Sequence, residues 1–167
     1  MVLAALFLSL AYVLPFLTGQ IQEIGAMLCP MHLPVLLCGF FAGPLWGALV
    51  GFVTPLLRSL MLGMPPLFPT AVCMAFELAA YAVVAALMHK HLPRKRPFVY
   101  LSLITAMLAG RIVWGIAMLV CMGLSGGTFT LGAFIAGAFV NAVPGITVQL
   151  VLIPVLVMIL DKRYRRI

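Results

Sequence analysis

Charged residues are scarce in this chain. Only 8% of its 167 residues are Asp, Glu, Lys or Arg, and just three are acidic, whereas a soluble domain carries about a quarter charged residues. Hydrophobic residues make up 65% of the sequence, and the mean hydropathy is +1.26. Because one membrane-spanning helix takes roughly 20 apolar residues, a chain of this length holds about six spans. We therefore predict an all-α integral membrane protein without a separate soluble domain.

The motifs of enzymes and nucleotide-binding proteins are also absent. The sequence has no G-x-x-x-x-G-K-[ST] phosphate loop, no H-E-x-x-H, no Ser/His pair and no carboxylate dyad. We predict that the protein is not an enzyme, binds no cofactor, and leaves ATP hydrolysis to separate ATPase subunits. Its basic residues fall mainly at 89–97 and 161–167 beside apolar runs, which is typical of cytoplasmic anchors rather than of nucleic-acid binding. The four cysteines form no C-x-x-C pair, so free thiols are expected rather than a disulfide or a zinc site.

Prolines, glycines and charges divide the chain into six predicted spans. We expect one membrane domain over residues 1–167, a six-transmembrane-helix bundle with spans at about 2–17, 24–42, 44–62, 70–88, 98–122 and 133–160. Pro30 and Pro34 interrupt the second span, so its regular part should begin near Met31. Because both basic segments belong on the cytoplasmic side, an even number of spans places the N- and C-termini in the cytoplasm. The loops at 18–30, 63–69 and 123–131 then face outside.

Ionised residues inside the apolar runs are the strongest functional signal. Arg58, Glu77 and Arg111 lie within predicted spans, where an unpaired charge costs several kcal/mol. From the helical rise per residue, these three residues and also His32 and Asn141 fall in the outer half of the bundle. The inner half contains almost no polar side chains, which indicates a pocket open to the outside. Structural roles remain open: Arg58 reaching the headgroups, a structural Glu77–Arg111 pair, Asn141 bonding a neighbouring helix, and His32 capping a broken helix.

The charges of this pocket indicate its ligand. If Arg58, Arg111 and Glu77 all line it and His32 is neutral, their charges sum to a single positive charge, which favours a ligand with a carboxylate or phosphate. Trp114 lies one turn from Arg111. It is expected to form an aromatic wall with Phe129, Phe76, Tyr81 and Phe139, although each of these aromatics can equally be a core or lipid-facing residue. Packing or bonding back to their own helix is expected for Thr105, Thr147 and Gln149.

Small residues form two rows at helical spacing. Gly43, Gly47 and Gly51 repeat every four residues, and so do Ala5 and Ser9. Such rows allow helices to approach closely. Packing inside the bundle explains the first row. For the second row, docking on another membrane protein remains a further possibility.

The run from Met27 to Leu57 and the span around Glu77 resemble the substrate-binding S components of energy-coupling factor (ECF) vitamin transporters. The motif H-[IL]-P-V-x-L-x-G-x-x-x-G-P-x-x-G occupies His32 to Gly47, an acid lies in the fourth span, and Asn141 lies in the sixth. The resemblance implies a multi-pass protein of a prokaryotic cell membrane that captures a micronutrient outside. It implies association with a transmembrane T component and two ATPase subunits.

The resemblance also implies roles for individual residues. Ala5 and Ser9 match a family motif that docks on the T component, with Ser9 in place of the usual alanine. Ligand contacts map onto Gln20, Glu77, Arg111, Asn141 and Phe129. The first outer loop lacks the aromatic residues of thiamine binders, which disfavours thiamine. Pantothenate or another anionic vitamin suits the net positive pocket better, and a pyridine-type vitamin or an uncharacterised nutrient is the next alternative.

Two other kinds of transport protein remain possible from the sequence, whereas a small membrane enzyme is disfavoured for want of a motif. A cluster of Met27, Cys29, Met31 and His32 at the outer mouth fits uptake of a soft metal such as nickel, cobalt or copper. The second possibility is a self-sufficient secondary transporter. Such a protein normally needs an ion relay and an inner gate, and the inner half of this bundle has too few polar residues for either.

Overall fold

The computed structural model describes residues 1–18, 28–93 and 95–160 of the chain, and every regular element in these residues is helical. Four helices are long and apolar enough to cross a membrane: α4 (Pro44–Leu62), the short turn η2 (Leu67–Ala71) joined to α5 (Val72–His91), α6 (Arg96–Leu124) and α8 (Val143–Leu160). The predicted all-helical membrane bundle is thereby confirmed, while a six-span count stays a prediction.

Three further apolar helices are shorter. They are α1 (Val2–Val13) with its continuation η1 (Leu14–Thr18), α3 (His32–Ala42), and α7 (Leu131–Ile135) with its continuation η3 (Ala136–Val140). The helix α3 begins one residue after Met31, as the prolines of this segment predict. Its own Pro34 lies in the first turn, where a missing N–H group leaves no intrahelical bond unmade.

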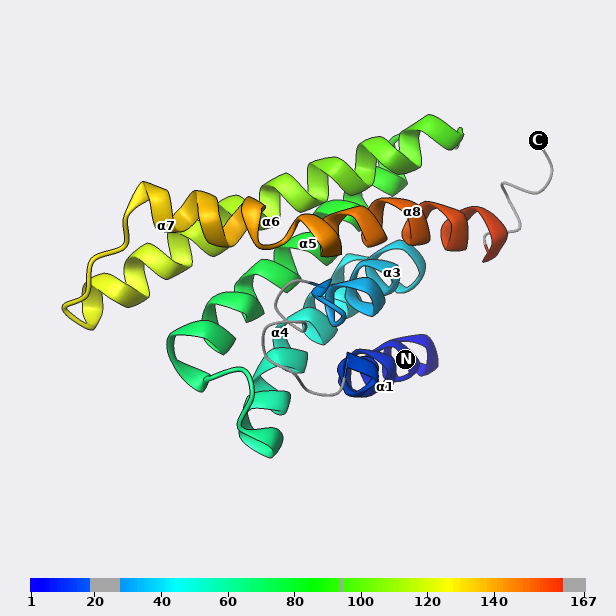
Figure 1. Ribbon diagram of the computed structural model, residues 1–167. Coiled ribbons are helices and arrows are strands. Elements are labelled where there is room, and N and C mark those ends of the chain that lie inside the picture. Colours follow the sequence, from blue (N-terminus) through cyan, green and yellow to red (C-terminus); the bar gives the residue numbers. More distant parts are fainter. Residues whose placement is uncertain (19–27, 94, 161–167) are drawn as a thin grey trace.

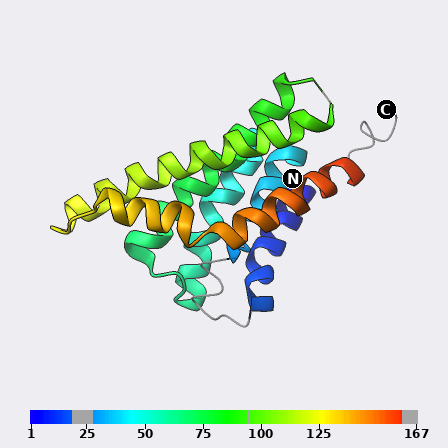
Figure 2. The same cartoon turned by 45° about the horizontal axis from the view of Figure 1, so that its top comes forward.

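Helix α5 lies at the centre of the bundle. It packs against α3, α4 and α6, while α1 lies against α3 and α4 at the periphery and α8 contacts α6 and α3 (Figure 1). In Figure 2 the first turn of α1 and the last turn of α8 lie toward the same end as the turn between α5 and α6. The α4–η2 and α6–α7 connections lie at the other end. This arrangement suits termini on one side of a membrane, and their cytoplasmic location stays a prediction.

Glycines let α3 and α4 approach α5 closely. A Cβ atom added to Gly51 would lie 2.7 Å from the backbone carbonyl of Leu78, and one added to Gly47 would lie 2.8 Å from the Ala82 side chain. Gly43 instead forms the turn before α4 with φ +91°, a conformation that glycine adopts without strain. Packing within the bundle therefore explains Gly47 and Gly51, and a turn explains Gly43.

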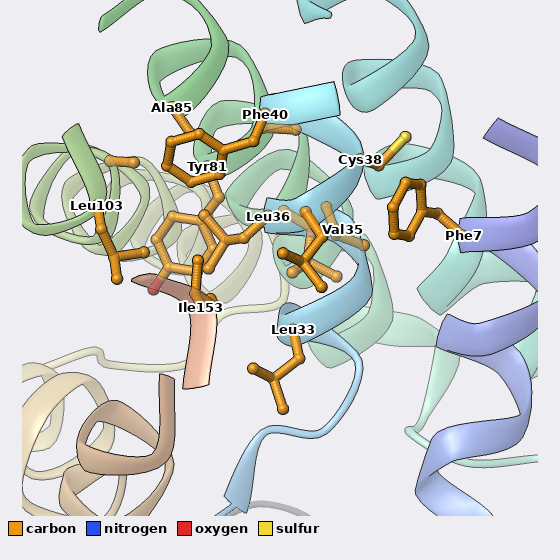
Figure 3. Close-up of a cluster of buried hydrophobic side chains, with 14 of the residues drawn as sticks. Phe7, Leu33, Val35, Leu36, Cys38, Phe40, Tyr81, Ala85, Leu103 and Ile153 are labelled. Atoms are coloured by element: carbon orange, nitrogen blue, oxygen red, sulfur yellow. The ribbon is translucent and has the colours of Figure 1, made fainter. Parts of the chain in front are cut away.

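The apolar core lies where α3, α5, α6 and α8 meet. Figure 3 shows Leu36, Tyr81, Leu103 and Ile153 within this cluster, and Phe7 of α1 packs on its far side. These side chains are almost fully buried. On α5 the core residues all follow Glu77 along the helix. The apolar core therefore lies on one side of the charged residues around Glu77.

The predicted sixth span is interrupted. A single helix was expected over 133–160, but α7 and η3 end at Val140 and α8 begins at Val143. Pro144 is the second residue of α8, where its lack of an N–H group is tolerated; farther inside a continuous helix it would remove a hydrogen bond and clash with the preceding turn. The break places Asn141 in the connection between the two helices.

Candidate functional site

Glu77 is the centre of a buried polar group. It lies on α5, is 1% exposed, and its Oε1 atom is 2.9 Å from Nη1 of Arg111 on α6. The Tyr81 hydroxyl donates a hydrogen bond of 3.0 Å to the same oxygen, and His32 Nε2 of α3 lies 3.8 Å from it. Three helices thus direct polar side chains at one carboxylate, and we call Glu77, Arg111, Tyr81 and His32 the Glu77 cluster.

Helical spacing and one glycine assemble this cluster. Tyr81 follows Glu77 by four residues, so both side chains lie on one face of α5. A Cβ atom at Gly110 would overlap the Tyr81 ring, so the ring fills the space that this glycine leaves beside Arg111. The His32 ring lies 5.4 Å from the Tyr81 ring, centroid to centroid. Cys29, which precedes α3, lies close enough to Arg111 for the two side chains to interact electrostatically.

Part of the hydrogen-bonding capacity of the cluster is unused. Neither ring nitrogen of His32 has a hydrogen-bond partner among the described residues, and neither has Nε of Arg111. A buried polar atom without a partner costs about 1–3 kcal/mol. The arrangement therefore favours contact with a further polar group.

Arg58 has a different environment from the one predicted. It is 5% exposed, its Nη1 donates a hydrogen bond of 3.2 Å to the backbone carbonyl of Tyr12, and its guanidinium lies 5.6 Å from the centre of the Phe16 ring. The side chain thus joins α4 to the end of α1 and to η1. It is neither exposed to headgroups nor among the residues that contact Glu77. The described cluster consequently pairs one negative with one positive charge, rather than carrying the predicted excess of positive charge.

Aromatic side chains gather one turn along α6 from Arg111. The Trp114 ring lies 5.9 Å from that of Phe129 and 6.2 Å from that of Phe134, which in turn lies 6.1 Å from Phe139. The predicted contact of Trp114 with Phe129 is present, whereas Phe134 was not predicted. Phe76 points elsewhere and packs on Phe52 with 48% of its surface exposed.

The remaining predicted contacts lie apart or outside the described residues. Asn141 is exposed, and its backbone N–H donates to the carbonyl of Ala136. Gln20 and Met27 fall in residues 19–27, outside the described part of the chain. No group of three or more His, Cys, Asp or Glu residues in the described ranges is placed to hold a metal ion. None of the four cysteines, all of which lie in the described ranges, is in a disulfide.

Two cavities lie on different sides of the core. One of about 150 Å³ reaches Arg111 between α6 and α8, and its other walls are apolar: Ile104, Met107, Leu108, Phe139, Ile146 and Leu150. A larger one of about 450 Å³ lies at the other end of the bundle among Gly43, His89, Lys90, Leu160 and their neighbours. Its lining shares no residue with the Glu77 cluster, so of these two cavities the smaller is the one that adjoins the buried charges.

Two functional candidates were underestimated from the sequence. Tyr81 was predicted only as an aromatic wall, although its position four residues after Glu77 is the spacing of a side-chain hydrogen bond on a helix. Gln149 was predicted to pack or to bond back to its helix, but it is 1% exposed and its Oε1 atom has no hydrogen-bond partner in the described residues. A lone amide in an apolar span carried the signal in the second case.

No curated protein and no solved structure matches this chain. A family model described as the substrate-specific component of ECF transporters does match it, over residues 1–157. The match covers nearly the whole chain and agrees with the resemblance noted at His32 to Gly47. The chain therefore belongs to the family of ECF transporter substrate-specific components.

Proposed function

We propose that this protein captures a vitamin or similar small micronutrient from outside a prokaryotic cell at the Glu77 cluster. It then delivers the solute across the membrane together with a T component and two ATPase subunits, which hydrolyse ATP. The observation that carries this proposal is the ion pair of Glu77 and Arg111, joined by Tyr81 and His32, inside an otherwise apolar bundle.

A purely structural ion pair accounts less well for this geometry. Removing two charges from water costs more than their attraction returns unless further hydrogen bonds satisfy both groups. In the Glu77 cluster, Arg111 Nε and both nitrogens of His32 lack such bonds in the described residues. A polar solute that contacts these atoms would complete the network, which supports binding as the role of the cluster.

The chemistry of the cluster favours a ligand with a polar head and a small apolar part. Glu77 occupies one edge of the Arg111 guanidinium through Nη1, and the remaining N–H groups suit a carboxylate or carbonyl of the ligand. The cavity beside Arg111 is otherwise apolar and suits an aliphatic segment. An anionic vitamin such as pantothenate meets both conditions, and it is the specific ligand that we propose.

The other predicted contacts are assigned by their surroundings. We place Trp114 and Phe129 at the rim of the site, one turn from Arg111, and keep Asn141 and Gln20 as proposed ligand contacts. We assign Arg58 to anchoring the end of α1, because its contacts are with Tyr12 and Phe16.

The outer face of α1 supplies a docking surface for the T component. Ala5 and Ser9 are both exposed, whereas Ala4, Phe7 and Ala11 bury the opposite face against the bundle. The Ser9 hydroxyl donates to the carbonyl of Ala5, so it presents no free donor to a partner helix. The resulting surface is small and smooth, which suits close helix packing in a membrane.

Binding and uptake assays test this function. Purified protein should bind radiolabelled pantothenate without ATP, and Glu77→Ala and Arg111→Ala should each weaken binding at least tenfold. Thr105→Val is a matched control on α6, because Thr105 is only partly buried and bonds back to the carbonyl of Leu101. Uptake should require co-expressed T and ATPase subunits.

Two results would contradict the proposal. Uptake by this chain alone would favour a self-sufficient secondary transporter. Unchanged binding in both charge variants would remove the Glu77 cluster from the site. If pantothenate does not bind but another vitamin does, and the two charge variants lose it, the site stands and the ligand changes.

A further inference from the structure

Gln149 differs from the other neutral polar residues of the spans. It is 1% exposed, and its Oε1 atom has no hydrogen-bond partner within the described residues. Thr105 and Thr147 bond back to the carbonyls of Leu101 and Val143 at 2.8 and 2.9 Å, as predicted for packing residues. An amide whose only role was to join two helices would form a hydrogen bond to the neighbouring helix. The side-chain oxygen of Gln149 forms no such bond within the described residues.

Helix register places Gln149 within about one turn of the level of Glu77. Ile153 belongs to the same buried cluster as Tyr81 and lies beside the hydroxyl end of its ring (Figure 3). Tyr81 follows Glu77 by one turn, and Ile153 follows Gln149 by one turn. The Tyr81 hydroxyl is itself bonded to Glu77, so Ile153 lies near the level of the Glu77 carboxylate. Because α5 and α8 run in the same general direction in Figures 1 and 2, Gln149 lies about one turn farther toward the end of the bundle where α6 meets α7.

The cavity beside Arg111 gives a second, independent placement. Ile146 and Leu150, which flank Gln149 on α8, both line it. This part of α8 therefore faces the region that Arg111 reaches from α6. Gln149 does not itself line the cavity; it follows Ile146 by three residues, so its buried amide lies on the adjacent face of α8, beside the site that we propose for the captured solute.

We propose that Gln149 is a further ligand-binding residue, whose side-chain oxygen accepts a hydrogen bond from an N–H or O–H group of the solute. Arg111 at the same site donates hydrogen bonds, so the two residues together select a small molecule that carries both a donor and an acceptor. The inference rests on the proposed function and narrows its ligand to a hydroxyl- or amide-bearing carboxylate, a class that includes pantothenate. Solutes with acceptors alone are rejected, because they would leave the buried oxygen unpaired.

Native mass spectrometry tests this inference directly. Wild-type protein, Gln149→Met, Gln149→Leu and Thr147→Val are purified, incubated with pantothenate, desalted and weighed with any bound molecule. Methionine keeps the length of glutamine without its acceptor, and leucine tests a different shape. Thr147 is exposed on the same helix and provides the matched control. Melting temperatures are recorded without added ligand.

We expect wild-type protein and Thr147→Val to carry the same bound molecule, and both Gln149 variants to show less than a tenth of that occupancy. The Gln149 variants should melt no lower than wild-type protein, because an unpaired buried oxygen has been removed. Full occupancy in either Gln149 variant would overturn the inference and leave the proposed function intact. So would lower melting temperatures in both variants, or a bound molecule without a donor group. An empty wild-type protein would instead overturn pantothenate as the ligand, and this inference with it, whereas the capture of another vitamin at the Glu77 cluster is tested by the charge variants.

Discussion

The ion pair of Glu77 and Arg111 permits a test that separates stability from binding. Glu77→Gln keeps the shape of the side chain and an oxygen that can accept from Tyr81, but it leaves Arg111 charged without its partner. The two groups are 1% and 7% exposed and their atoms lie 2.9 Å apart. The guanidinium therefore cannot exchange its lost partner for bulk water without rearrangement of the bundle.

The expected magnitude follows from the burial of the pair. Removing one partner of a buried ion pair destabilises a protein by about 3–5 kcal/mol, whereas replacing both partners with neutral groups is often nearly neutral. We expect Glu77→Gln to lower the free energy of unfolding by roughly that amount. The double variant Glu77→Gln/Arg111→Met should recover most of the loss, because no unpaired charge remains. Binding should nevertheless be lost in both, since neither retains the pair that contacts the solute.

Unfolding in detergent, followed by circular dichroism, measures the first quantity, and retention of radiolabelled pantothenate measures the second. Recovery of stability without recovery of binding is the expected result. A double variant that regains both would show that the pair only holds the helices together. A single variant as stable as wild-type protein would refute the burial argument itself.

The remaining predictions concern the support of the site and its docking face. Gly110→Ala should displace the Tyr81 ring, lowering stability by about 1–3 kcal/mol and weakening binding, whereas Gly123→Ala on the same helix faces open space and should change neither. Arg58→Met should lower the melting temperature by freeing η1 yet leave ligand affinity within about twofold; a large loss of affinity would return Arg58 to the site. Ala5→Trp should spare binding but stop uptake in cells that express the complete transporter, and normal uptake would exclude this docking face.

Composition and proline positions sufficed to predict the class and most helix ends. Hydropathy fixed the membrane environment, and Pro30 correctly placed the start of α3 near Met31, because a proline ring excludes a continuing helix before it. The interruption at 141–142 was missed. Pro144 was visible in the sequence, but a proline in an apolar run can also produce a mere kink, as the uninterrupted α4 and α8 around Pro55 and Pro154 show.

Side-chain partners were harder to predict than helices, and Arg58 shows why. Its place inside a span indicated a buried cation, which is correct, but its partners are a carbonyl at the end of α1 and the face of Phe16. Neither partner has a compositional signature, since every residue has a carbonyl and the chain contains 11 phenylalanines. Whether Arg58 contacts Glu77 or the end of α1 depends on how the helices pack against one another. Hydrophobic periodicity alone does not specify this packing.

The pairing of Glu77 with Arg111 shows how such packing information enters. The sequence left a Glu77–Arg111 pair open, although, counted from the predicted span ends, Arg111 lies about 17 Å and Glu77 about 10 Å below the outer surface. In the structure the segment before Glu77 begins at Leu67 and contains the non-helical Phe68. Counted as a straight helix from Leu67, Glu77 lies about 15 Å deep, and Arg111 lies about 20 Å from the end of α6 at Leu124. The two depths still differ by about 5 Å, so counting from the helix ends does not by itself reveal the pair. The Tyr81 ring against Gly110 then draws α5 and α6 together, so that they meet.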